Sequence, residues 1–210
     1  MVEWRRRRAM RQAAFVVGFN LAVFCAFARF GGIAVGAAKS WIGRRRFEVV
    51  RFGVVEAITL LEPPALAVTT FVLLVNRDSA QAASAGEAAA SLAGGLVALL
   101  GLAMCVWTVL SWRQLFVGHG VLGGQQLVTG GAYGAVRHPV YLGGVLIWAG
   151  LSICFLSLVA AAITLFYVVP AYLLYIRSEE AMMLEAFGEE YSSYRGQVPM
   201  LLPRRRGRRA

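Results

Sequence analysis

Charged residues are scarce in this sequence, and its longest apolar stretch has none. Of the 210 residues, only 15% are charged and 59% are hydrophobic, and the stretch from Val140 to Ile176 carries no acidic or basic side chain over 37 residues. So little charge excludes an ordinary soluble domain, in which about a quarter of the residues are charged. The composition predicts a polytopic membrane protein instead.

Signatures of metal and phosphate binding are also missing. The three cysteines, Cys25, Cys105 and Cys154, lie inside apolar runs at unequal spacings, which favours core filling over disulfides or metal ligation. The glycine-rich stretch 118–131 lacks a G-x-G-x-x-G fingerprint that follows a strand, and it has no G-K-[ST]. We therefore expect no Rossmann domain, no P-loop and no metal centre.

Five apolar runs have about the length needed to cross a bilayer core of about 30 Å, which takes roughly 20 helical residues. They cover residues 13–40, 53–75, 92–112, 140–156 and 158–176. The last two belong to one uncharged stretch that is too long for a single helix, so a helical hairpin turning near Leu156-Ser157-Leu158 is predicted. The predicted fold class is all-α: a polytopic transmembrane helix bundle that forms a single domain, 1–210.

Basic residues flank these runs in three clusters, at Arg5 to Arg8, Arg44 to Arg46 and Arg204 to Arg206. Juxtamembrane arginines mark the cytoplasmic side and attract anionic headgroups, so membrane lipids are expected partners. Nucleic acid is not, because the clusters lack interleaved aromatic residues and a soluble domain. Residues 13–40 separate two of the clusters, and they fit either a re-entrant hairpin broken near Arg29 or a true span.

The run 53–75 contains Glu62 followed directly by Pro63 and Pro64. The two prolines are expected to kink or split the helix. An ionisable side chain in such a segment should face protein or water rather than lipid. Glu62 therefore fits a contact inside the bundle, for example with an arginine, or a direct catalytic role.

The stretch from Gly131 to Gly143 is a polar island between apolar runs, and it holds Arg137, His138 and Pro139. An arginine and an imidazole at this position are costly unless they are paired or face water. The predicted hairpin brings them to the end where Glu179 and Glu180 begin an acidic segment. We expect one cytoplasmic site there; the alternative is a plain loop whose proline opens the next helix.

Five residues at spacings of 4, 3, 4 and 3 share one face of the helix that follows: Glu180, Leu184, Phe187, Tyr191 and Tyr194. Glu179 lies about 100° around the helix from this face. A carboxylate beside aromatic rings suits a cationic ligand. The same pattern also fits an amphipathic helix on the membrane surface, with the tyrosines as interfacial anchors.

Four motifs occur in a fixed order: Gly-Ala-Tyr-Gly-Ala-Val-Arg-His-Pro-Val-Tyr-Leu-Gly at 131–143, Glu-Glu at 179–180, Phe-Gly-Glu-Glu-Tyr at 187–191 with Tyr194, and Val-Pro at 198–199 before Pro203. They resemble the isoprenylcysteine carboxyl methyltransferase family and its phospholipid methyltransferase relatives. The resemblance covers residues 127–203, the predicted methyltransferase motif region. It implies an integral membrane enzyme with S-adenosylmethionine held in a cytoplasmic pocket of the helix bundle.

The resemblance also implies roles for individual residues. Those expected to contact or enclose the cofactor are His138, Tyr141, Gly143, Glu179, Glu180 and Tyr191, with Tyr133, Leu127 and Val128 at the entrance. The candidate catalytic residues are Glu180, Arg137 and Arg177, where the arginines would hold the cofactor carboxylate or an anionic acceptor. The sequence departs from the family's Gly-Pro-Tyr-Arg start, with Ala132 for proline and Gly134 for arginine.

The expected acceptor is a lipophilic small molecule or a lipidated, isoprenoid-type molecule that presents a carboxylate, a thiol or a lipid headgroup. Two other functions stay open, since sterol reductases also resemble the C-terminal pattern and would bind NADPH. The acidic helix disfavours a phosphorylated dinucleotide, which prefers arginine partners. The remaining alternative is a non-catalytic membrane protein that anchors a partner. Nothing in the sequence indicates an oligomeric state.

Overall fold

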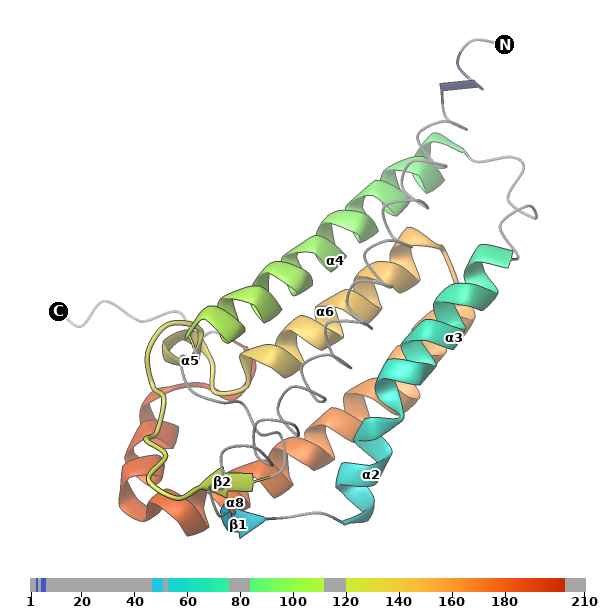
Figure 1. The fold of residues 1–210 in the computed structure, drawn as a ribbon. Helices are drawn as coiled ribbons and strands as arrows, with labels where there is room; N and C mark the ends of the chain where they lie inside the picture. Colours follow the sequence, from blue (N-terminus) through green and yellow to red (C-terminus); the bar gives the residue numbers. More distant parts are fainter. Residues whose placement is uncertain are drawn as a thin grey trace, which may run out of the picture.

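The computed structural model describes residues 3, 5, 6, 47–50, 53–75, 84–111 and 120–202. These residues form a helix bundle with one two-stranded antiparallel ladder, β1 (Phe47–Val50) and β2 (Gly120–Leu122). Figure 1 shows the long helices running side by side, with the ladder at one end of the bundle. The predicted helical fold is confirmed. The ladder was not predicted, because two strands of three or four residues carry too short a pattern to recognise.

Two helices of the described residues are long and apolar enough to cross a membrane: α4 (Ala85–Ser111) and the continuous helix Leu158–Gln197. Helix α6 (Pro139–Cys154) is a shorter apolar helix. The predicted run 53–75 corresponds to α2 (Val54–Leu60) and α3 (Glu62–Val75). The predicted run 13–40 lies outside the described residues.

Helix α4 begins seven residues before the predicted start at Leu92. The backbone N–H of Ser84 donates to Glu87 Oε2 at 2.7 Å, and the backbone N–H of Glu87 donates to Ser84 Oγ at 3.2 Å. This reciprocal pair is a capping box, which satisfies donors that the helix start would leave open. The predicted start was wrong because it followed hydropathy alone and overlooked the Ser-x-x-Glu signal.

Replacing Ser84 by Ala is expected to lower the free energy of unfolding by about 1 kcal/mol, because the helix loses its N-cap acceptor. Unfolding in detergent, followed by circular dichroism, measures the change. Ser192→Ala is the matched control, since Ser192 is exposed inside a helix. Equal effects of the two substitutions would mean that the capping box contributes nothing.

The break between α2 and α3 falls at Leu61, and both prolines lie in the first turn of α3. A proline is tolerated there because the first N–H groups of a helix have no partner within it. The predicted split is confirmed. Glu62 is 3% exposed, and the indole Nε1–H of Trp148 in α6 donates to its Oε1 at 2.7 Å. Glu62 thus makes a contact inside the bundle, as one of the two interpretations expected, with an indole as a donor.

Helices α4 and α6 lie antiparallel and side by side (Figure 1), and their backbones come into close contact at glycines. A Cβ on Gly94 would lie 2.6 Å from the carbonyl oxygen of Gly150, and a Cβ on Gly150 would lie 2.7 Å from that of Gly94. About two turns farther along α4, a Cβ on Gly101 would lie 2.6 Å from the carbonyl oxygen of Gly143. Only glycine permits such close approach, so this seam fixes the position of α6, which carries the polar island at its start.

The predicted hairpin is confirmed. Helix α6 ends at Cys154, and Ser157 caps the next helix, α7 (Leu158–Ile163), by accepting a hydrogen bond from the backbone N–H of Ala160. The chain then passes through a π-helical turn, η2 (Thr164–Val168), into α8 (Val169–Gln197). Inside this turn the buried Thr164 hydroxyl donates to the carbonyl of Ala160 at 2.7 Å and lies 3.2 Å from the hydroxyl of Ser152.

Helix α8 is kinked at Gly188, whose φ of 50° and ψ of −120° are not helical. The prediction of one straight face from Glu180 to Tyr194 was therefore wrong, because it assumed an unbroken helix. The last turns of α8 change direction, as the red end of the chain shows in Figure 1. Tyr191 and Tyr194 are nevertheless buried, and so is Glu180 on the other side of the kink.

Candidate functional site

The polar island folds into a short helix, α5 (Ala132–Ala135), and the first five residues of α6. Ser111 at the end of α4 accepts a hydrogen bond from the backbone N–H of Ala132 at 2.9 Å, which ties this loop to the bundle. Pro139 opens α6, where its fixed φ suits the first helical turn. His138 directly precedes Pro139 and has a non-helical backbone conformation. Its ring contacts Glu180 of α8.

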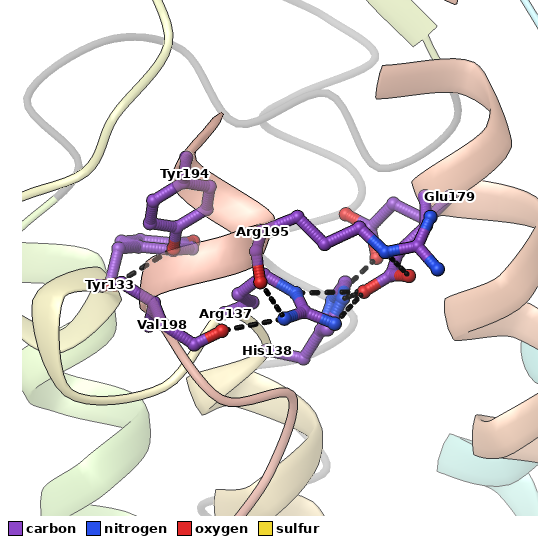
Figure 2. Close-up of polar contacts among 8 residues, drawn as sticks. Tyr133, Arg137, His138, Glu179, Tyr194, Arg195 and Val198 are labelled. Carbon is purple, nitrogen blue, oxygen red and sulfur yellow. Dashed lines mark hydrogen bonds and ion pairs between the residues drawn. The ribbon is translucent and has the colours of Figure 1, made fainter. Parts of the chain in front are cut away.

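Glu180 is the centre of a polar cluster that joins the two ends of the hairpin (Figure 2). Arg137 donates from Nε at 2.9 Å and from Nη2 at 2.7 Å to Glu180 Oε1. His138 Nε2 lies 3.1 Å from the same oxygen, and Arg195 Nε lies 3.6 Å from Oε2. The side chains of Arg137 and Glu180 are 10% and 11% exposed, so this ion pair is largely shielded from solvent.

His138 lies between two carboxylates: its Nδ1 is 3.5 Å from Glu179 Oε2, and its Nε2 faces Glu180. Burial alone would lower the pKa of His138, but hydrogen bonds and charges from Glu179 and Glu180 outweigh it and raise the pKa above its usual value. The folded protein therefore favours the imidazolium form of this side chain.

This raised pKa predicts a pH dependence of stability. A histidine whose pKa is higher in the folded state stabilises the fold fully below its unfolded pKa of about 6.5, and loses that contribution as the pH rises through the folded value. The melting temperature in detergent should therefore fall as the pH rises above about 6.5, and the slope should shrink in His138→Gln. His119→Gln changes the chain's other histidine and is the control. An unchanged slope in His138→Gln would contradict the assignment.

The segment Val198–Met200, here called the C-terminal strap, is bound to the polar island through the backbone. The N–H of Arg137 donates to the carbonyl of Pro199 at 2.9 Å, and that of His138 donates to Met200 at 3.2 Å. Arg137 Nη1 also donates to the carbonyl of Val198 at 2.6 Å and to that of Arg195 at 2.9 Å. The strap and the end of α8 are thus fastened across the polar island.

Aromatic rings surround the cluster. The hydroxyl of Tyr194 donates to the backbone carbonyl of Tyr133 at 2.7 Å (Figure 2), and the rings of Tyr191 and Tyr194 are 5.9 Å apart. Burial, followed by the charge of Glu179, raises the pKa of Tyr133 far above its usual value, so its phenol stays neutral. The ring of Tyr141 is 5.9 Å from that of His138 and belongs to the apolar core.

The structure brings together Arg137, His138, Glu179 and Glu180, as expected from the predicted hairpin. Other predicted site residues lie elsewhere. Gly143 faces α4, where a Cβ would collide with Cys105, so its place is the helix seam. Arg177 is exposed on α8 and takes no part in the contacts of the cluster.

Leu127 and Val128 are half-buried in the irregular segment before α5. Two features of the site escaped the sequence reading: Arg195, and the fastening of the strap by Arg137. The Val-Pro motif at 198–199 lies in the strap, but the hydrogen bond that Arg137 donates to the strap could not be predicted, because every residue has a backbone carbonyl. Arg195 directly follows Tyr194 and could have been found by its place beside the motif.

The site's residues come from both ends of a helical hairpin, in a bundle that contains two helices long and apolar enough to cross a membrane among the described residues. Residues 89–190 match a protein family described as phospholipid methyltransferase. The matched stretch includes the polar island and both glutamates of the cluster. The resemblance to membrane methyltransferases that the motifs indicated is therefore confirmed.

Two curated proteins with similar sequences are also methyltransferases by name. Methanethiol S-methyltransferase of Crocosphaera subtropica is 40% identical over 72 residues, which are 34% of this chain and 27% of that protein. Methanethiol S-methyltransferase 1 of Bradyrhizobium diazoefficiens is 39% identical over 75 residues, which are 35% of this chain and 25% of that protein. The similarity thus spans about a quarter of the length of these relatives.

Proposed function

We propose that the protein is an integral membrane methyltransferase that uses S-adenosylmethionine at the end of the bundle where the hairpin's polar ends meet. The observation that carries the proposal is the cluster of Arg137, His138 and Glu180, built from two motifs 43 residues apart. Both motifs fall inside the stretch that matches the methyltransferase family. The same comparisons do not favour a reductase or a non-catalytic anchor.

The proposed arrangement places the whole chain in the membrane as one domain of five hydrophobic segments, with 127–203 as its methyltransferase region. The arginine clusters on the flanks put the site on the cytoplasmic side and attract anionic lipids. In this orientation the described start of α6 and the Glu179-Glu180 turn of α8 face the cytoplasm together.

The residues of the cluster fit the polar part of the cofactor. S-adenosylmethionine, when bound, supplies a methyl group on a positively charged sulfur for direct displacement by the acceptor. Its amino acid part carries a carboxylate and an ammonium, which need a cation and an anion from the protein. Glu179 offers the anion, because its side chain is 21% exposed, whereas Glu180 is occupied by Arg137 and His138.

The residues of the cluster contribute alignment of the reactants rather than acid–base catalysis. Glu180 holds Arg137 and His138 in place, and these hold the strap over the polar island. The buried rings of Tyr133 and Tyr191 suit the flat, aromatic part of the cofactor. Methyl transfer depends mainly on such alignment and on exclusion of water.

The proposed acceptor is lipophilic, and a thiol is favoured over a carboxylate or a lipid headgroup. The support is the activity named for both curated relatives, whose substrate is a small apolar thiol. When bound, S-adenosylmethionine would supply its methyl group to the thiol, whose proton would leave to solvent, while Glu179 would hold the cofactor's ammonium. A thiolate is a strong nucleophile, so no metal is needed for this step.

Calorimetric titration of the purified protein in detergent with S-adenosylhomocysteine tests the proposal, with NADPH as the comparison ligand. We expect micromolar binding of the first ligand only, lost in His138→Ala and weakened at least tenfold in Glu180→Gln. The melting temperature of each variant must be measured alongside, because both side chains are buried. Wild-type affinity in both variants would show that the cofactor does not bind at this cluster.

A further inference from the structure

Arg137 uses most of its hydrogen-bonding capacity within the protein. Its Nε and Nη2 donate to Glu180, and its Nη1 donates to the carbonyls of Arg195 and Val198. A guanidinium has five N–H donors, and four of them are used here. With a side chain only 10% exposed, Arg137 has little capacity left for a ligand. Arg137 therefore has a structural role, in which it connects Glu180 with the carbonyls of Arg195 and Val198.

Arg177, the other arginine expected to hold an anion, stands outside the cluster on an exposed part of α8. It lies three residues before Glu180, close to one helical turn away in sequence, yet the contacts of the carboxylate come from Arg137, His138 and Arg195. An anion bound at the cluster therefore requires a different cation.

Arg195 has the properties that Arg137 and Arg177 lack. Its side chain is 49% exposed, and its closest contact to Glu180, from Nε to Oε2, is a long 3.6 Å. Its backbone is nevertheless fixed, because its carbonyl accepts the hydrogen bond from Arg137. Figure 2 shows the side chain of Arg195 extended across the cluster toward Glu179. The backbone of Arg195 is held in place while its guanidinium makes only a long contact, so the guanidinium is available to bind a ligand.

The charges of the cluster point the same way. Three basic side chains, Arg137, His138 and Arg195, face two carboxylates, Glu179 and Glu180. With His138 protonated, the cluster has one positive charge in excess. This excess charge would attract a ligand carboxylate, and arginine binds carboxylates in a planar, two-bonded geometry.

We propose that Arg195 binds the carboxylate of the cofactor's amino acid part, and that Arg137 positions Arg195 by holding its backbone carbonyl. The inference rests on the proposed use of S-adenosylmethionine. It assigns the carboxylate to a residue on the far side of the Gly188 kink, so the direction of the last turns of α8 decides whether the site is complete.

A purely structural role for Arg195 has a different signature. A cation in the last turn of a helix interacts favourably with the unpaired carbonyls there, and Arg195 occupies such a turn. Loss of that interaction would lower stability, and it would affect every ligand of the site alike. Binding of a carboxylate affects only ligands that carry one.

The test compares two ligands on three proteins: S-adenosylhomocysteine and its decarboxylated analogue, titrated into wild type, Arg195→Gln and Arg177→Gln. We expect Arg195→Gln to weaken S-adenosylhomocysteine roughly 10- to 100-fold, as loss of a charge-assisted hydrogen bond does, and to leave the analogue's affinity unchanged. Arg177→Gln, an exposed arginine on the same helix, should change neither affinity. Arg195→Lys should recover part of the loss, because it keeps the charge.

Equal losses for both ligands in Arg195→Gln, or no loss for either, would overturn the assignment while leaving the cofactor itself in place. The same holds if Arg177→Gln weakens S-adenosylhomocysteine as much as Arg195→Gln does. A wild-type protein that binds neither ligand would instead overturn the proposed function and this inference with it. The melting temperatures of all variants separate these outcomes from misfolding.

Discussion

Replacing Arg137 by Ala is expected to lower the free energy of unfolding by about 3–5 kcal/mol, the cost of breaking a buried ion pair by removing one partner. Glu180 would keep its charge but lose the two closest donors, at 2.7 and 2.9 Å. The carbonyls of Arg195 and Val198 would lose a donor as well. Denaturant unfolding in detergent measures the change, and the proposed methyl transfer should be lost with it.

Two further variants isolate the cause. Arg177→Ala removes an exposed arginine and should change stability by less than about 0.5 kcal/mol. Arg137→Lys keeps the charge but has three donors on a compact head, where Arg137 makes four hydrogen bonds from a planar fork, so it should recover only part of the loss. If Arg137→Ala were as stable as Arg177→Ala, the cluster would not hold the strap and the hairpin together.

Replacing Gly94 by Ala is expected to destabilise the protein by about 1–3 kcal/mol, the usual cost of overpacking a close contact. The new Cβ would collide with the backbone of Cys154 and lie 2.6 Å from the carbonyl of Gly150. Both obstacles are backbone atoms, so no side chain can rotate away, and α4 and α6 must separate. In Gly150→Ala the new Cβ would lie 2.7 Å from the carbonyl oxygen of Gly94, so a similar effect is expected.

Gly95→Ala is the control, because a Cβ built at Gly95 meets no atom within 4 Å apart from the adjoining backbone of its own helix. Alanine is the better helix former by about 1 kcal/mol, so this variant should be neutral or slightly more stable. Melting temperatures of the two variants in the same detergent decide the matter. A Gly94→Ala variant that matches Gly95→Ala would show that the two helices can part without loss.

The sequence predicted the hairpin and its meeting ends for a simple physical reason. An uncharged stretch of 37 residues is too long for one crossing and about right for two, so both of its polar ends must lie on the same side. From that alone, Arg137 and His138 were expected beside Glu179 and Glu180, and the structure has them in contact.

The missed features depend on backbone geometry rather than on hydropathy. Gly188 adopts a positive φ inside α8, which residue periodicity cannot reveal, because glycine also occurs in unbroken helices. The partners of Arg137 include two backbone carbonyls, and every residue has one. Gly143 was expected at the cofactor because it belongs to the motif; the structure adds a packing contact with α4, and the contact with the cofactor stays a prediction.

The π-helical turn Thr164–Val168 sets the rotational phase of everything that follows it in the last helix. A π turn holds one residue more than the corresponding α turn, and one residue corresponds to about 100° of rotation around the axis. Deleting a single residue there would let the helix run on regularly, but it would turn Tyr172, Tyr175 and Glu180 away from the partners that they now meet. The length of this apolar turn, which contains no group of the site, thus determines the direction in which the site's central carboxylate points.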